Sequence, residues 1–174
     1  DTGFYKKGRI IIMPKELLSA QYEEIKGARG ALLAYCESMK PADLFKKVET
    51  FNNSSIADLL VHNVNTYISW INNFGLDRNA SFYKTEDVSN LDGVKSLFEE
   101  VNVLMAEFME KYNGNFEEPF TAMVKHRGFS MTLSPLQLYT HVITHEFHHK
   151  GQIMTMSRLL GHTPVDTDTI RFTP

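Results

Sequence analysis

The sequence predicts an all-α protein, an antiparallel four-helix bundle with a short β-hairpin before the last long helix. Three observations support this fold class. Apolar residues recur at steps of three and four through four long segments, which is the period of an amphipathic helix. Proline and glycine fall at the ends of these segments. The chain changes character only around residues 116–133, where two short runs flank Gly128 and predict a hairpin.

The composition is that of an ordinary globular domain, with 43% hydrophobic residues, 22% charged residues and a net charge of −3 over 174 residues. The slight acidity argues against a nucleic-acid partner. The chain has no apolar run of about 18 residues, so no membrane span is expected. Cys36 is the only cysteine, which excludes a disulfide framework, fits a cytoplasmic protein and restricts any metal site to nitrogen and oxygen ligands.

The first helix is expected to begin at Pro14, a favourable residue for a first turn, and to run to about Met39. Residues 1–12 precede this pattern and are expected to be an extension, either native or left from cloning. Pro41 then opens a short helical turn over residues 42–48.

Three further helices follow. The second is expected to start at a cap formed by Ser54 or Ser55, to run to about Asn73 and to be stopped by Gly75. The third is expected over residues 86–112. The hairpin is expected to pair residues 121–124 with residues 129–132. The fourth helix starts at Ser134-Pro135, ends near Leu160 before Gly161, and is followed by a polar tail.

The last helix carries four of the seven histidines, at positions 141, 145, 148 and 149. His141, His145 and His149 share one side because residues four apart lie on one face of a helix. Neutral imidazole is the commonest protein ligand for metals, and several core-facing histidines would be costly unless they bind something. One ion cannot take both His141 and His149, which lie about 12 Å apart along the axis. The pairs His141/His145 and His145/His149 both remain open, with His148 less well placed.

His62, on the second helix, is the natural third ligand. Small polar residues surround it, and they indicate either a solvated helix face or the wall of a pocket. The absence of Lys and Arg from this helix favours the pocket. Asp58, one turn away, is a candidate to orient the His62 ring, whereas Glu146 points about 100° away from His145 and is a doubtful base.

Two motifs resemble those of the DinB family, the DinB/YfiT-like metalloenzymes. Residues 145–153, His-Glu-Phe-His-His-Lys-Gly-Gln-Ile, are similar to the family's His-x-x-His-His-(Arg/Lys)-Gly-Gln-Ile element on its last long helix. Leu59-Leu60-Val61-His62, with Trp70 eight residues later, resembles the family's second-helix motif, and Asp166-Thr167-Asp168 is similar to a tail motif. The resemblance covers residues 13–174 as one domain.

The resemblance implies an up-down-down-up helix order and a divalent ion held by His62, His145 and His149. It leaves His141 and His148 as non-ligands that line the pocket or form hydrogen bonds nearby. It also implies a homodimer. A second apolar stripe on the last helix independently indicates a further packing partner, which could be the hairpin, the tail or another subunit. This stripe consists of Ile143, Phe147 and Met154.

Family relatives differ in activity, so the resemblance implies several alternative activities for this chain, each on a small-molecule substrate. The most concrete is a metal-dependent S-transferase that uses a low-molecular-weight thiol such as bacillithiol or mycothiol. His126 or Arg127 on the hairpin would either receive an anionic thiol at the pocket mouth or, as is commoner for such residues, be solvated at the surface. The alternatives are a metal-dependent hydrolase and a non-catalytic metal or small-ligand binding protein. Three imidazoles suit Zn, Ni, Fe or Mn, and the sequence identifies no catalytic acid or base.

Overall fold

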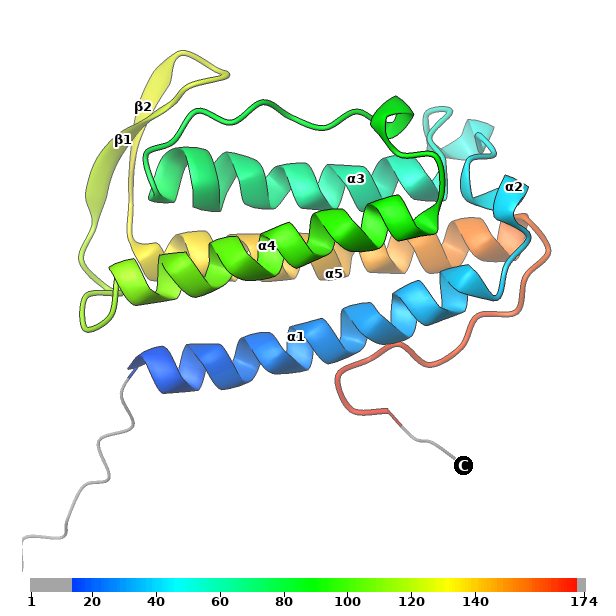
Figure 1. The fold of residues 1–174 in the computed structure, drawn as a ribbon, viewed down its shortest axis with the longest axis horizontal. Helices are drawn as coiled ribbons and strands as arrows, with labels where there is room; N and C mark the ends of the chain where they lie inside the picture. Colours follow the sequence, from blue (N-terminus) through cyan, green and yellow to red (C-terminus); the bar gives the residue numbers. More distant parts are fainter. Residues whose placement is uncertain (1–13, 172–174) are drawn as a thin grey trace, which may run out of the picture.

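Four long helical segments lie side by side around one apolar core in the computed structural model, which describes residues 14–171 (Figure 1). The expected extension, residues 1–12, lies outside the described residues. The chain is mostly helical, with one short hairpin before the last long helix. Its elements are α1 (Pro14–Glu37), α2 (Pro41–Leu44), η1 (Glu49–Phe51), α3 (Ile56–Tyr67), η2 (Ile68–Gly75), η3 (Thr85–Asp87), α4 (Leu91–Lys111), β1 (Phe120–Val124), β2 (Phe129–Leu133) and α5 (Pro135–Leu159).

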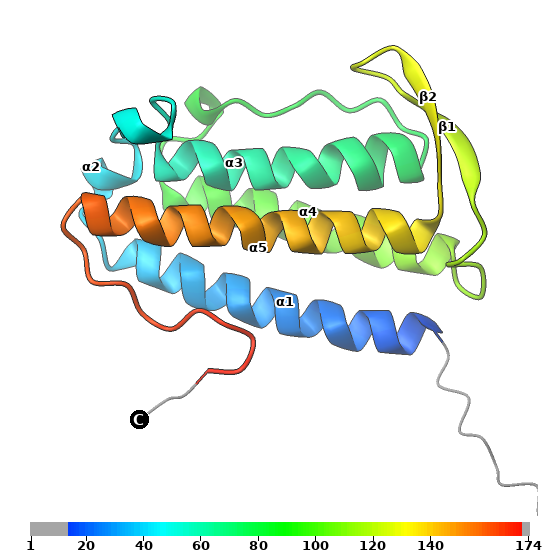
Figure 2. The same ribbon diagram turned by 180° about the vertical axis from the view of Figure 1, so that it is seen from behind.

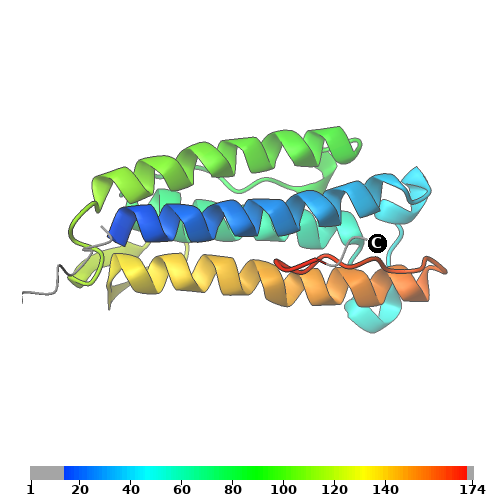
Figure 3. The same ribbon diagram turned by 90° about the horizontal axis from the view of Figure 1, so that it is seen from below.

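Helix α1 lies between α4 and α5 when the molecule is seen from below (Figure 3). It runs antiparallel to α4, because Tyr22 in its first half donates a hydrogen bond of 3.0 Å to Asn102, whereas Glu37 at its end pairs with Lys95 at 3.0 Å. Contacts at two heights of the helix pair therefore fix the opposite directions.

Helices α1 and α5 instead run in the same direction (Figure 2). The Tyr139 hydroxyl donates to the Leu18 carbonyl at 2.8 Å near the start of both helices. The Tyr35 hydroxyl donates to the Ser157 hydroxyl at 2.9 Å near their ends. The neighbouring long helices are thus not all antiparallel, in contrast to the simplest form of the predicted fold.

The loop at residues 76–84 returns along α3 before α4 begins (Figure 1). Two hydrogen bonds between the Asn65 side chain and the Tyr83 backbone, of 2.8 and 2.9 Å, hold the loop against α3. Because the chain returns to the start of α3, α4 runs parallel to α3, whereas α3 and α5 are antiparallel. The order up, down, down, up results for α1, α3, α4 and α5, as the resemblance implies.

The third long helix is shorter than the sequence predicts. The expected start near Glu86 falls in a separate 3-10 turn, η3, whose backbone N–H at Lys84 donates to the Asp87 carboxylate at 2.7 Å. Helix α4 begins only at Leu91, where the Asn90 side chain accepts a hydrogen bond of 3.0 Å from the Gly93 backbone. Two polar caps thus lie close together in the sequence. The Asp87 side chain caps η3, and the Asn90 side chain caps α4.

The second helix changes type halfway along its length. The α-helix ends at Tyr67 and continues as the π-helix η2 to Gly75, where the Leu76 N–H reaches back five residues to the Ile71 carbonyl at 2.8 Å. Apolar periodicity does not distinguish these two helix types. Glycine is required at the end because a Cβ on Gly75 would lie 2.8 Å from the Phe108 ring.

The hairpin and the start of the last helix agree with the prediction. Strands β1 and β2 pair antiparallel from Phe120 opposite Leu133 to Val124 opposite Phe129. Gly128 in the turn has a φ of +70°, which favours glycine. A capping box between Ser134 and Gln137, followed by Pro135, begins α5.

The core is built from the inward sides of α1, α3, η2, α4 and α5, and Tyr67, Phe74, Phe108 and Met156 are among its largest fully buried side chains. Within residues 14–171, none of the helices combines the length and apolar character that crossing a membrane requires.

Candidate metal centre

Three histidine rings from α3 and α5 meet on one side of the helix pair. The Nε2 atom of His145 lies 3.0 Å from the Nε2 of His62 and 3.0 Å from the Nε2 of His149. All three offer a ligand atom within 4.8 Å of one another, the one such group of histidine, cysteine and acidic residues found within residues 14–171. The antiparallel crossing of α3 and α5 brings His62 opposite the helical pair of His145 and His149.

The surroundings favour the neutral form of all three rings. Burial lowers the pKa of His62 and of His149. Burial, together with the neighbouring imidazoles, lowers the pKa of His145 to about 4. A neutral imidazole presents a lone pair on one ring nitrogen, which is the form that binds a metal ion.

The close approach of the three nitrogens fits a shared cation. A neutral ring carries at most one proton on Nε2, so one proton on His145 can bridge only one of its two 3.0 Å contacts. An ion placed about 2.0–2.1 Å from each nitrogen would satisfy all three lone pairs. The donor set therefore fits a divalent ion with imidazole ligands.

The other two histidines of α5 lie beside this group without joining it. His141 is exposed, and its ring centroid lies 5.2 Å from the Trp70 ring in an edge-on contact. His148 is also exposed, and its Nε2 lies 3.3 Å from the Gln152 amide nitrogen. Of the two pairs that spacing left open, the structure brings His145 and His149 together with His62.

The histidines are less deeply placed than the sequence predicts. His62 is exposed, and His145 and His149 are half-buried at the margin of α5 rather than within the core. The apolar residues on the same side of α5, such as Val142 and Ile153, are fully buried. The rings therefore stand at the edge of the core, where a ligand can reach them.

A pocket of about 430 Å³ opens beside the three-histidine group. It is lined by His62, Asn65, Thr66, Ser69, Trp70, Phe82, His126, Arg127, His141 and His145. Among residues 14–171, Arg127 is the only permanently charged residue of this lining, which contains no carboxylate. Ser69 and Trp70 come from the π-helical segment, so the change of helix type shapes the wall. The hairpin residues His126 and Arg127, for which the sequence left both positions open, are exposed and also line the pocket.

Two residues, Lys125 and His126, hold the hairpin turn against the loop at residues 76–84. The Lys125 ammonium pairs with Asp77 at 3.0 Å and donates to the Arg78 carbonyl at 2.8 Å. The ring of His126 meets the ring of Phe82 edge-on, with 5.4 Å between centroids. The hairpin and the loop at residues 76–84 thus form one continuous wall.

Asp58 does not orient the His62 ring, contrary to the sequence-based expectation. Its carboxylate accepts hydrogen bonds from the Ser55 backbone at 2.6 Å and from the Thr85 hydroxyl at 2.6 Å, and it pairs with Lys47. Burial acts to raise the pKa of Asp58, but these hydrogen bonds lower it overall to about 2. Asp58 therefore forms the capping box of α3 together with Ser55, and these partners engage its carboxylate.

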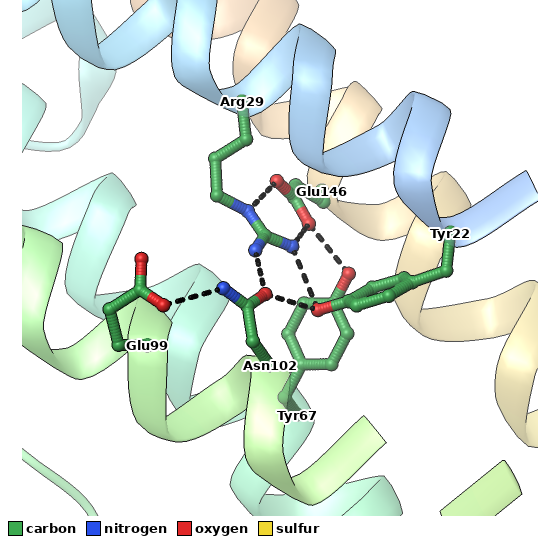
Figure 4. Close-up of polar contacts among 6 residues, drawn as sticks. All are labelled: Tyr22, Arg29, Tyr67, Glu99, Asn102 and Glu146. Carbon is green, nitrogen blue, oxygen red and sulfur yellow. Dashed lines mark hydrogen bonds and ion pairs between the residues drawn. The ribbon is translucent and has the colours of Figure 1, made fainter. Parts of the chain in front are cut away.

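Glu146 is buried and belongs to a polar network with Arg29 and Tyr67 (Figure 4). Its carboxylate accepts two hydrogen bonds from Arg29, of 2.7 and 2.8 Å, and one from the Tyr67 hydroxyl at 2.6 Å. Asn102 and Tyr22 complete the set around the guanidinium. Sequence reasoning missed Arg29 entirely, because its partner is 117 residues away and no local pattern relates the two.

The tail motif packs against α5 on the side away from the pocket. Lys150 is buried, and its ammonium donates to the Thr167 carbonyl at 2.7 Å and pairs with Asp168 at 3.2 Å. The same ammonium lies 4.0 Å from the centroid of the Phe147 ring. Lys150 therefore links the tail to Phe147, one residue of the second apolar stripe of α5.

Comparison with known proteins agrees with this arrangement. No curated protein matches the chain. The sequence model of the DinB family matches residues 13–174, which is nearly the whole chain and includes all three clustered histidines. By this match, the chain belongs to the DinB family.

Proposed function

We propose that the chain is a metal-dependent enzyme in which His62, His145 and His149 hold one divalent ion. The observation that carries this proposal is the convergence of three ring nitrogens within 4.8 Å beside a pocket. Three protein ligands leave room for a substrate on the ion, as in catalytic sites and unlike closed structural sites. Zn, Ni, Fe and Mn are all compatible with imidazole ligands.

The most concrete activity is the transfer of a low-molecular-weight thiol onto an electrophilic carbon. A bound divalent ion would lower the pKa of a thiol, or of a water molecule in the alternative hydrolase. In the transfer, a carbon–sulfur bond forms, the leaving group departs with its electron pair, and the thiol proton passes to solvent. Trp70 and Phe82 offer apolar surface to the substrate, and the Ser69 hydroxyl has no hydrogen-bond partner among the described residues.

The charge of the pocket supports an anionic thiol. Arg127 stands at the hairpin turn, where its Nε lies 3.3 Å from the His126 Nε2, and no carboxylate pairs with it among the described residues. A carboxylate on the thiol would find a free guanidinium there.

Metal content tests the site. The purified wild-type chain should carry one equivalent of a divalent ion, and the variants His62→Ala and His149→Ala should lose it. His141→Ala is the matched control, because His141 lies one turn from His145 in the same pocket but outside the three-histidine group. Retention of the ion by both of the first two variants would exclude this ligand set.

Turnover separates the candidate activities. The metal-loaded chain is mixed with 1-chloro-2,4-dinitrobenzene and bacillithiol, mycothiol or cysteine, and release of chloride is followed. A rate that requires both thiol and metal supports the transferase. Hydrolysis of p-nitrophenyl acetate without thiol would identify the hydrolase instead. Metal binding with neither activity would leave a binding protein.

The family membership and the helix directions support two structural proposals. The four long helical segments form a four-helix bundle, and residues 13–174 form a single domain. A single urea transition, with helical and aromatic signals that coincide, would be expected for such a domain.

A homodimer is also proposed. The exposed side of α5 carries Leu136, Thr140, Thr144, Gly151, Thr155 and Leu159, which recur at steps of four and seven, and Arg158 is the one charged residue on this side. The two exposed leucines at its ends offer apolar surface to a second copy of the chain. Light scattering of the purified chain should give twice the mass of 19.9 kDa, and Thr144→Arg should lower it.

A further inference from the structure

Gln152 contacts two histidines of α5 at once. Its side-chain oxygen lies 2.7 Å from the Nδ1 of His149, and its amide nitrogen lies 3.3 Å from the Nε2 of His148. The two partners are three and four residues earlier on the same helix. Helical side chains point back toward the N-terminus, so Gln152 is placed to reach both rings.

The short contact determines which nitrogen of His149 carries the proton. The amide oxygen can only accept a hydrogen bond, so Nδ1 of His149 must donate it. The Nε2 atom of a neutral ring is then unprotonated, and its lone pair faces the Nε2 of His145 at 3.0 Å. The opposite orientation of the amide would place a proton on Nε2 and block it.

The contact with His148 is consistent with this orientation of the amide. When the Nε2 of His148 is unprotonated, it accepts from the Gln152 nitrogen, and the Gln152 oxygen is then directed at His149. His148 is not one of the clustered histidines, but it contacts Gln152 and so acts on the orientation of the Gln152 amide.

His149 is the only ring of the three that is held in this way. No hydrogen bond within residues 14–171 involves the Nδ1 atom of His62 or of His145. The tautomers of these two rings are therefore not selected by a protein group, whereas that of His149 is. Partners of this kind for metal-binding histidines typically change metal affinity by about 10- to 100-fold.

We propose that Gln152 is a positioning residue that holds His149 in the tautomer able to bind a metal ion, and that His148 orients Gln152. This inference rests on the proposed three-histidine site. It assigns functions to two residues of the family motif that are not themselves ligands.

Nitrogen-15 NMR of the histidine rings in the metal-free protein tests the tautomer directly. His149, assigned with the His149→Ala variant, should show a protonated Nδ1 and an unprotonated Nε2. Gln152→Met is nearly isosteric but can neither accept nor donate this bond, and it should shift His149 toward a mixture of tautomers. A wild-type His149 ring protonated on Nε2 would overturn the inference.

Zinc affinity, measured by competition with a chelator at constant pH, provides the second test. Gln152→Met should bind zinc about 10- to 100-fold more weakly than wild type. Gln152→Glu restores an acceptor at the same place and should recover wild-type affinity or exceed it. His148→Ala should show a smaller loss, because it removes only the contact that orients Gln152.

The outcomes distinguish this inference from the proposed site. If His149→Ala loses zinc but Gln152→Met binds it as wild type does, the site stands and the role of Gln152 is wrong. If His149→Ala keeps zinc, the site itself is wrong. Thermal melts show whether Gln152→Met folds. If it does not, the other two variants still test the proposal. Weaker zinc binding by Gln152→Glu than by wild type, together with wild-type affinity in His148→Ala, would contradict it.

Discussion

Arg29 on α1 and Glu146 on α5 form a two-point ion pair, with nitrogen–oxygen distances of 2.7 and 2.8 Å, and only 4% and 5% of each residue is exposed. Glu146 is the residue directly after His145, so the pair fixes the rotation of α5 about its axis at the height of the histidines. Because Glu146 faces α1, the neighbouring residue His145 faces His62 on α3.

Breaking this ion pair is expected to be strongly destabilising. Glu146→Ala leaves the Arg29 guanidinium buried without its counter-ion, and the free energy of unfolding should fall by about 3–5 kcal/mol. Urea denaturation followed by circular dichroism measures the change. The double variant Arg29→Met, Glu146→Leu removes both charges and should be less destabilised than either single variant. A loss below about 1 kcal/mol in Glu146→Ala would contradict this account.

The cap of α3 should make stability depend on pH in the acidic range. Asp58 has a pKa of about 2 in the folded chain, below its ordinary value of 3.8. A lowered pKa means that the ionised carboxylate stabilises the fold at pH values above about 4 and that this contribution disappears as the pH falls toward 2.

The variant Asp58→Asn isolates this contribution. At pH 6 it should be about 1 kcal/mol less stable than wild type, because the amide oxygen can still accept from the Ser55 backbone but no longer carries the charge that Lys47 and the start of the helix favour. At pH 2.5 the difference should shrink, because the Asp58 carboxyl of the unfolded chain, with its ordinary pKa of 3.8, is then protonated and the folded state has lost most of the advantage of its ionised carboxylate. Urea unfolding at the two pH values provides the comparison, and a difference that stays constant would show that the charge of Asp58 does not matter.

The sequence predicted the parts of the fold that depend on local signals. Pro14, Ser134-Pro135 and the glycines at helix ends marked real element ends, and the four-residue spacing of histidines placed His145 and His149 on one face. The choice of His149 over His141 came from the family resemblance. Spacing alone could not make it, because both pairs are geometrically equivalent on a helix.

The parts that the sequence did not predict depend on contacts between distant segments. Asp58 was expected at His62, but its carboxylate instead accepts hydrogen bonds from the Ser55 backbone at the start of α3 and from the Thr85 hydroxyl beyond the returning loop, and it pairs with Lys47. The π-helical segment has the same apolar pattern as an α-helix. The contact between Gln152 and His149 could have been predicted from the sequence, because residues three apart on a helix lie within reach of each other.

The tail should depend on Lys150 for its position. Lys150→Met keeps the apolar stem against Phe147 but leaves the buried Thr167 carbonyl without its donor, at a cost of about 1–3 kcal/mol. Limited proteolysis should then cut between residues 162 and 171 faster than in wild type, and any divalent ion bound to the purified protein should be retained at the wild-type level. Unchanged protection of the tail would mean that its other contacts suffice.

The close approach of Gly75 to Phe108 gives a prediction about the end of the π-helix. A methyl group on Gly75 would lie 2.8 Å from one atom of the Phe108 ring and 3.1 Å from another, so Gly75→Ala overfills the space between η2 and α4. Overfilling of this kind typically costs about 1–3 kcal/mol. The Gly75 carbonyl also accepts hydrogen bonds from Lys111 and Tyr112 at 2.8 and 2.6 Å, so the backbone has little freedom to move away.

A second substitution distinguishes crowding from any other effect of the alanine. Phe108→Leu alone should be destabilising, because it leaves space in a fully buried site. Combined with Gly75→Ala, it should cost less than the sum of the two single variants, because the new methyl group occupies the space that the ring vacates. Urea unfolding of the four proteins gives the coupling energy. If the two effects simply add, crowding against Phe108 is not the reason that glycine stands at the end of η2.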